Sequence, residues 1–248
     1  MTVGSLKGER SKVDIAENIR KVRSRMADAA VSVGRSPEDI ILVGASKTKP
    51  SADVRAAIAA GIDAVGENRV QELTAKRSEG AYEGVPLHFI GHLQRNKVRQ
   101  IVGAVDLIQS VDSHELLRLI DARAGALGIV QDILLEVNIG NEASKSGISP
   151  VLLPSLLDTA AGLGSIRVRG LMSIPPISTE SGGNRPYFAG MYKLFVDIGR
   201  KKYDNILMDF LSMGMSEDYP DAIMEGANMI RVGSAIFGAR IYKDQEVK

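Results

Sequence analysis

The chain has 248 residues, 44% hydrophobic and 25% charged, which is the composition of a soluble globular protein with a sizeable core. A formal net charge of +1 and an aromatic content of 4% argue against a nucleic-acid-binding surface. The absence of cysteine excludes disulfides, thiol catalysis and cysteine-ligated metals. No segment approaches the roughly 18 apolar residues of a membrane span, and residues 1–12 lack a signal-peptide apolar stretch. We therefore expect a cytoplasmic protein that binds neither nucleic acid nor membrane.

The first predicted element is an amphipathic helix over residues 12–33. Its apolar side chains recur at intervals of three and four residues, at Ile15, Ile19, Val22, Met26 and Ala30. Basic residues between positions 20 and 25 fit a solvated face better than a contact surface. Gly34 supplies a stop signal for the helix.

Short apolar runs and helical segments then alternate along the rest of the chain. The runs predict eight strands, at residues 40–45, 64–66, 87–90, 106–111, 133–137, 168–173, 206–211 and 229–232. The segments between them predict helices at residues 51–60, 69–77, 94–102, 113–126, 154–163, 187–200 and 217–225. This alternation is typical of a parallel sheet with helical crossovers.

Eight such units in a chain of 248 residues match the (β/α)₈ TIM-type barrel in number and in size. An open doubly wound sheet is the alternative, because a sequence does not show which strands are neighbours. The lack of any linker between the units favours closure into a single domain, 1–248, with a core at about 12–242 and an extra N-terminal helix. The longest irregular stretch, 175–186, is a candidate loop at the active face.

Lys47 is the most informative side chain, because it directly follows the apolar run 40–45. In a barrel, chemistry takes place at the carboxyl ends of the strands. A lysine that is partly desolvated there, with Lys49 nearby, favours the neutral amine that condenses with a carbonyl group. The alternative is a lysine that extends to solvent or pairs with a carboxylate.

The last two strand ends carry turns of small residues, 212–216 and 233–238. The loops after strands seven and eight form the phosphate site that recurs in these barrels. Backbone N–H groups and the hydroxyls of Ser212 and Ser234 can donate to phosphate oxygens. A Schiff-base lysine opposite a phosphate site points to pyridoxal 5′-phosphate (PLP), which has both an aldehyde and a phosphate.

Arg231 lies in the last predicted strand and is a candidate partner for the pyridine nitrogen of PLP. An arginine only donates hydrogen bonds, so it keeps that nitrogen unprotonated and weakens the ring as an electron sink. The alternative is a structural salt bridge inside the barrel.

Several motifs resemble those of the pyridoxal phosphate homeostasis proteins. They are ASKTK (45–49), GEN (66–68) with QE (71–72), HFIGHLQ (88–94), SKSG (144–147), RGLM (169–172), LSMGMS (211–216) and GSAIFG (233–238). The match covers about residues 12–242. It implies a single barrel, related to the N-terminal domain of alanine racemase, that holds PLP as an aldimine and acts in cofactor supply.

The resemblance also assigns roles to individual residues. It implies that Lys47 forms the covalent aldimine, that Ser212, Gly233 and Ser234 bind the phosphate, that Arg231 meets the pyridine nitrogen, and that Asn68, Met172 and Met213 line the pocket. Lys145 lies in another of the motifs and is a candidate second acceptor of PLP. We expect no metal site: His88 and His92 share a strand face but lie about 13 Å apart on an ideal strand.

The leading functional hypothesis is a monomeric PLP carrier that buffers the cofactor and supplies it to apo-enzymes. The weak electron sink, and the expected lack of the further domain that supplies a second base in the related racemases, both disfavour efficient racemisation. A PLP enzyme of low or narrow activity, racemase-like and using Lys47 as a single base, is the second hypothesis. A Schiff-base aldolase acting on a phosphorylated sugar is the third.

Overall fold

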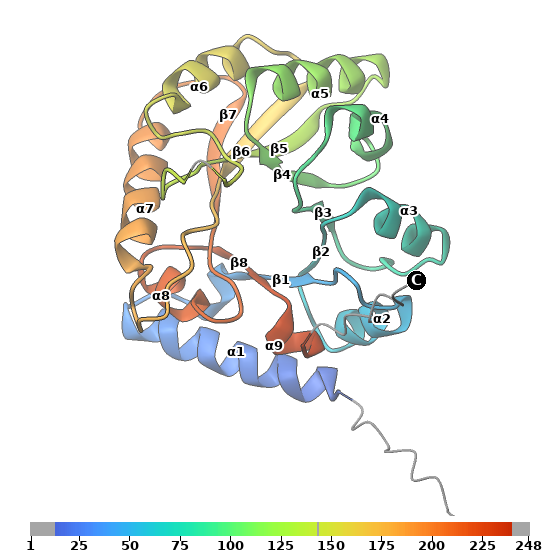
Figure 1. The fold of residues 1–248 in the computed structure, drawn as a ribbon, viewed down its shortest axis with the longest axis vertical. Helices are drawn as coiled ribbons and strands as arrows, with labels where there is room; N and C mark the ends of the chain where they lie inside the picture. The colour runs from blue at the N-terminus through green and yellow to red at the C-terminus, as the bar shows by residue number, and fades with distance from the viewer. Residues whose placement is uncertain (1–12, 143, 240–248) are drawn as a thin grey trace, which may run out of the picture.

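The computed structural model describes residues 13–142 and 144–239. Within them the strands form one closed parallel barrel in chain order, with β1 hydrogen-bonded to β8 (Figure 1). The strands are β1 (Ile41–Ala45), β2 (Ala64–Glu67), β3 (Leu87–Phe89), β4 (Leu107–Val111), β5 (Gln131–Glu136), β6 (Ile166–Met172), β7 (Ile206–Ser212) and β8 (Met229–Val232). The predicted (β/α)₈ barrel is confirmed, and the open sheet is not formed.

Helices surround this barrel, as Figure 1 shows. They are α1 (Ile15–Ser32), η1 (Pro37–Asp39), α2 (Ser51–Ala59), α3 (Val70–Ser78), η2 (Arg95–Lys97), α4 (Val98–Ile101), α5 (His114–Ala126), α6 (Leu153–Ala161), α7 (Arg185–Gly199), α8 (Tyr219–Met224) and α9 (Ser234–Phe237). The helix predicted over 94–102 is divided into a 3₁₀ turn, η2, and the short α4. The polar residues of η2 are not buried, whereas α4 buries Val98 and Ile101, so the apolar face spans a single helical turn.

The extra N-terminal helix α1 lies along α8 and α9 (Figure 1). Asp14 caps it by accepting a hydrogen bond from the backbone N–H of Glu17, at 2.9 Å. The predicted apolar stripe is buried against the barrel helices. Asn18 donates to the carbonyl of Ile236 at 2.9 Å, which ties α1 to the helix that follows β8.

The core has two layers that follow the two-residue period of the strands. One layer fills the space between the strands and the outer helices. The other fills the barrel interior, with Val43, Ala64, Leu107, Leu134, Met172 and Met229. Two residues further along β4, β5 and β8, the same face carries Gln109, Glu136 and Arg231, all buried. The apolar interior therefore becomes polar at the carboxyl ends of the strands.

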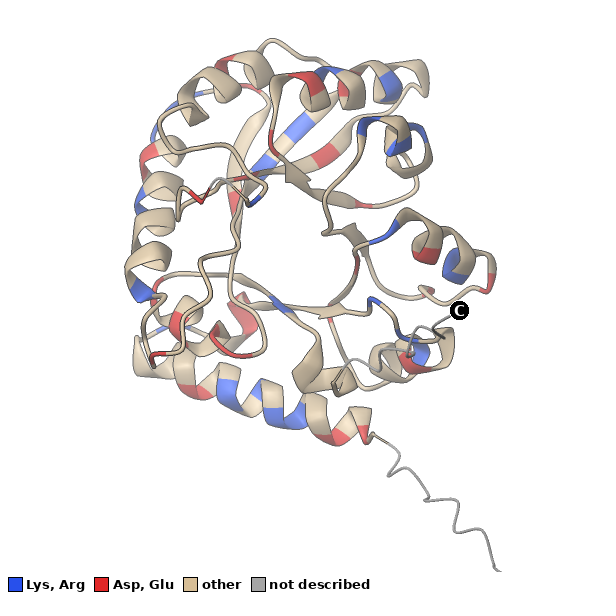
Figure 2. Ribbon diagram, viewed as in Figure 1, with Lys and Arg blue, Asp and Glu red and all other residues tan. Residues whose placement is uncertain are grey.

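Both signs of charge are spread over the outer helices (Figure 2). On α1, Arg20 and Lys21 lie within ion-pair distance of Glu17, and Arg23 pairs with Asp63 at 2.7 Å. These intramolecular pairs fit the predicted solvated face. In the described part of the chain, none of the helices has both the length and the apolar character needed to cross a membrane.

Candidate functional site

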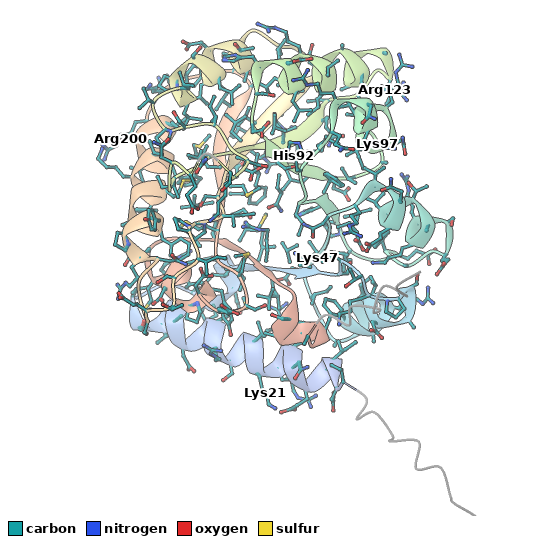
Figure 3. All side chains as sticks on the ribbon, viewed as in Figure 1. Lys21, Lys47, His92, Lys97, Arg123 and Arg200 are labelled. Atoms are coloured by element: carbon teal, nitrogen blue, oxygen red, sulfur yellow. The ribbon has the colours of Figure 1, made fainter. Side chains whose placement is uncertain are left out.

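A cavity of about 620 Å³ opens at the carboxyl ends of the strands. It brings together five predicted residues that are far apart in sequence: Lys47, Asn68, Arg231, Gly233 and Ser234. Figure 3 shows Lys47 above β1, at the edge of the barrel opening. Residues 174–178 and 180–184 form another part of the wall, so most of the irregular stretch predicted at the active face lines this cavity.

The other three predicted residues lie beneath the cavity and do not line it. Met172, Ser212 and Met213 are each fully buried, with an exposed fraction of 0%. Met172 belongs to the apolar barrel interior, and Met213 packs in the outer core layer. The hydroxyl of Ser212 forms hydrogen bonds with Arg231 and Gln109 within the barrel.

The turn that carries Lys47 is held through its backbone. Thr48 has a φ of 65°, in the left-handed region that non-glycine residues rarely adopt. Its N–H donates to Glu72 Oε2 at 2.7 Å, and the carbonyl of Ser46 accepts from Lys76 Nζ at 2.9 Å. Both partners come from α3. The position of Lys47 is thus fixed by a helix that packs outside the barrel.

A buried ion pair supports this turn from below. Lys76 Nζ lies 2.6 Å from Glu67 Oε1, and both side chains are almost completely buried. The same oxygen accepts hydrogen bonds from Ser46 Oγ and, at 3.1 Å, from Tyr82 OH. Burial, followed by the charge of Glu67, raises the pKa of Tyr82, which therefore stays a hydrogen-bond donor. The cluster joins β2 and α3 to the end of β1.

Arg231 enters the cavity from β8, the strand hydrogen-bonded to β1, and is only 4% exposed. Its Nη1 donates to Ser212 Oγ at 2.6 Å, and its Nη2 donates to the carbonyl of Ser173 at 2.9 Å. Burial lowers the pKa of Arg231 to about 10, so it remains charged at neutral pH. Burial, then Asp112, raises the pKa of Glu136 to about 7, although the charge of Arg231 opposes this shift.

Ser216 belongs to the site but was not among the predicted residues. Its Oγ accepts hydrogen bonds from the backbone N–H groups of Gly233, at 3.2 Å, and Ala235, at 3.3 Å, and the residue lines the cavity. Gly214, with a φ of 90°, makes the turn that returns the chain to this position. The small-residue motif 212–216 was the available signal, but it did not indicate which serine faces the cavity.

Two further lysines line the cavity and have defined partners. Lys145 Nζ lies 2.5 Å from Glu142 Oε2 and donates to the carbonyl of Pro175 at 3.0 Å. Lys49 Nζ donates to the carbonyl of Phe237 at 2.7 Å, which ties the Lys47 turn to the end of α9. Both amines are therefore engaged in contacts that hold the walls of the cavity.

The two histidines considered for metal binding have separate surroundings. His88 is buried on β3 and contacts Gln109, whereas His92 Nδ1 lies 3.4 Å from Ser146 Oγ. Among the residues that the structure describes, no group of three or more His, Asp or Glu side chains could hold a metal ion.

The residues present suit a ligand that is anionic at one end and carries a carbonyl group at the other. The cavity offers the amine of Lys47 and the guanidinium of Arg231, with the small residues Gly233 and Ser234 beside them. The Oδ1 atom of Asn68 is buried without a hydrogen-bond partner among the described residues, so a donor on a ligand can satisfy it. An aldehyde is a suitable partner for a lysine amine in such a position.

Comparison with known proteins identifies the family. The family described as alanine racemase, N-terminal domain, matches residues 13–241. The pyridoxal phosphate homeostasis protein of Pseudomonas aeruginosa is 43% identical over 229 residues, which cover 92% of this chain and 96% of that protein. The chain belongs to the pyridoxal phosphate homeostasis protein family.

Two other proteins are similar to this chain over most of its length. The pyridoxal phosphate homeostasis protein of Escherichia coli K12 is 40% identical over 233 residues, 92% of this chain and 98% of that protein. The solved structure of PipY from Synechococcus elongatus, with PLP bound, is 34% identical and covers 91% of this chain and 100% of its own, with a TM-score of 0.78. The family resemblance of the sequence motifs is therefore confirmed over most of the chain.

Proposed function

We propose that this protein binds PLP in the cavity at the barrel mouth and acts in the cytoplasm to hold, buffer and supply the cofactor. The observation that carries the proposal is the presence of Lys47, Arg231, Gly233 and Ser234 in one cavity, although they come from opposite ends of the sequence. A lysine amine, a guanidinium and a turn of small residues match the aldehyde, the pyridine nitrogen and the phosphate of PLP. Relatives named for PLP homeostasis, and PipY with PLP bound, support this choice of ligand.

Each residue has a distinct part in the proposed binding. Lys47 forms a Schiff base with the aldehyde, whose oxygen leaves as water. Ser234 and Ser216 donate hydrogen bonds to the phosphate through their hydroxyls, and Gly233, whose N–H donates to Ser216 Oγ, leaves room for the phosphate to approach. Arg231 donates to the pyridine nitrogen, and Asn68 contacts the ring from the wall of the cavity. Met172 and Met213 pack beneath the site and support its shape.

The chemistry of Arg231 and the names of the relatives support a carrier role. A pyridine nitrogen that accepts from arginine stays unprotonated, which limits the ability of the ring to stabilise a carbanion. The relatives are named homeostasis proteins. We therefore propose a monomeric carrier without efficient racemase activity, which transfers PLP to apo-enzymes.

The binding proposal is tested by adding PLP to the purified apo-protein and recording the visible absorption of a Schiff base. The wild type should develop this band, and sodium borohydride should fix the cofactor covalently. Lys47→Ala should lose the band but keep weak, phosphate-dependent binding. The same band in Lys47→Ala, or none in the wild type, would contradict the proposal.

The carrier role needs a separate experiment. The loaded protein should activate an apo PLP enzyme faster than the same concentration of free PLP does. Amino-acid turnover by the loaded protein should stay near the rate that free PLP supports. Turnover far above that rate would instead favour a PLP enzyme.

A further inference from the structure

A continuous chain of hydrogen bonds runs through the barrel interior beneath the cavity. It begins at Arg231, whose Nη1 donates to Ser212 Oγ at 2.6 Å. Ser212 Oγ lies 2.7 Å from Gln109 Oε1, and Gln109 Nε2 lies 2.9 Å from His88 Nδ1. The four residues belong to β8, β7, β4 and β3, so the chain crosses the barrel.

The direction of every bond follows from the chemistry of the groups. Arginine only donates, so Ser212 accepts from Arg231 and gives its own proton to Gln109 Oε1. The amide nitrogen of Gln109 must then donate to His88 Nδ1, which places the ring proton of His88 on Nε2. Burial lowers the pKa of His88 to about 4, consistent with a neutral ring that accepts at Nδ1. Gln109 Nε2 also lies 3.2 Å from the sulfur of Met229, as expected for a donor.

These polar groups lie next to a strictly apolar layer. Val43, Leu134, Met172 and Met229 fill the barrel interior. Gln109 and Ser212 are fully buried, so each depends on the chain for its hydrogen bonds. The one member that lines the cavity is Arg231. The chain therefore connects a charged group at the ligand site to neutral partners on the far side of the barrel.

We propose that Gln109 and His88, acting through Ser212, are positioning residues that fix the guanidinium of Arg231 for the pyridine nitrogen of PLP. This inference rests on the proposed function. All partners along the chain are neutral, so they orient Arg231 without neutralising it. Ser173 fixes a second N–H of the guanidinium through its carbonyl, and the cavity side remains for the ligand. The hydroxyl of Ser212 accordingly serves Arg231 and not the phosphate.

The first experiment replaces Gln109 with leucine and compares it with a matched variant, Gln131→Leu. Gln131 is also a buried glutamine of a barrel strand, but it bonds to Gly103 and Val105, away from the cavity. Gln109→Leu should raise the Kd for PLP about 2- to 12-fold, the effect of one neutral hydrogen bond. The pH midpoint of the visible band should also move lower, because a pyridine nitrogen released by Arg231 gains a proton and withdraws electrons from the ring. Gln131→Leu should change neither quantity.

The second experiment tests Ser212→Ala, a small change that keeps the packing, with PLP and with pyridoxal, which lacks the phosphate. A positioning role predicts that Ser212→Ala weakens the binding of both ligands by the same factor and shifts the pH midpoint of the visible band. Ser212→Thr, which keeps the hydroxyl, should restore the wild-type midpoint. A phosphate role predicts a loss for PLP alone and would overturn the inference.

The positioning role would also be overturned if Gln109→Leu and Gln131→Leu had the same Kd for PLP and the same pH midpoint of the visible band. If Gln109→Leu does not fold, the two Ser212 variants decide the matter. A wild-type protein that binds neither PLP nor pyridoxal would overturn the proposed function itself, whereas the results for the Gln109 and Ser212 variants test only the positioning role.

Discussion

Lys47 and Arg231 belong to neighbouring strand ends of the barrel mouth, but the structure holds them by different means. On the Lys47 side, a buried ion pair between Glu67 and Lys76 stabilises the backbone of the turn, from outside the barrel. On the Arg231 side, neutral groups inside the barrel contact the guanidinium itself. Changes on the Lys47 side should therefore mainly reduce folding stability. Changes on the Arg231 side should mainly reduce ligand affinity.

The largest expected effect comes from breaking the buried pair on the Lys47 side. Glu67→Gln leaves the buried ammonium of Lys76 with only the more distant carboxylate of Glu72, at 3.7 Å, so the free energy of unfolding should fall by about 3–5 kcal/mol. Urea denaturation of the apo-protein measures this loss. The control is Glu115→Gln, because Glu115 forms an exposed pair with Arg95 at 2.8 Å and should contribute less than about 1 kcal/mol. Equal losses in the two variants would remove the contrast between buried and exposed pairs.

The next effect concerns the pH dependence of stability and arises from Glu136, a buried carboxyl group of β5. The pKa of Glu136 is raised from 4.5 to about 7, so between these values the native protein binds a proton that the unfolded chain has lost. Stability contributed by this group therefore falls as the pH rises through that window. Glu136→Gln should remove this loss. Relative to the wild type, its free energy of unfolding should therefore be about 2–3 kcal/mol higher at about pH 8 than at about pH 5. Urea denaturation at the two pH values measures the gain, and a pH-independent difference would contradict the prediction.

A comparable effect, on binding, is expected for Arg231 itself. Arg231→Gln removes the charged donor, and the Kd for PLP should rise about 10- to 150-fold, equivalent to about 1.5–3 kcal/mol. Titration of the visible band measures the change. Arg169→Gln is the control, since Arg169 pairs with Asp132 and Asp209 and does not line the cavity. An unchanged Kd in Arg231→Gln would show that this side of the mouth does not bind the ligand.

The smallest expected effect tests the backbone of the Lys47 turn. Thr48→Gly relieves the left-handed conformation but adds chain entropy, so the stability should change by less than about 1 kcal/mol in either direction. Ala75→Gly, at an exposed position inside α3, gains no such relief and should lose about 1 kcal/mol. Thermal unfolding compares the two variants. A larger loss for Thr48→Gly would mean that the side chain of Thr48, and not its N–H, holds the turn.

The sequence was sufficient to predict the barrel and five of the residues that line its cavity. All eight predicted strands form, because their apolar runs have a clear length and spacing. Lys47, Arg231, Gly233 and Ser234 could be grouped because the carboxyl ends of parallel strands share one face of a barrel. These four residues lie at or close to the carboxyl ends of β1 and β8, so their positions in the sequence were enough to place them at the same end of the barrel.

Other features depend on the stagger of the strands, which a single sequence does not show. Ser212 lies beneath the cavity while Ser216 lines it, although both belong to one motif. The contact between His88 and Gln109 depends on the register of β3 against β4. The pair of Glu67 and Lys76 joins a strand to a helix, so a charge count could not identify it.

The identity of the lysine that reacts with PLP tests the central claim most directly. The protein should be loaded with PLP, reduced with borohydride, digested and mapped by mass spectrometry. The added pyridoxyl group should be found on Lys47. Modification of Lys49 or Lys145 in place of Lys47, or no modified peptide at all, would contradict it.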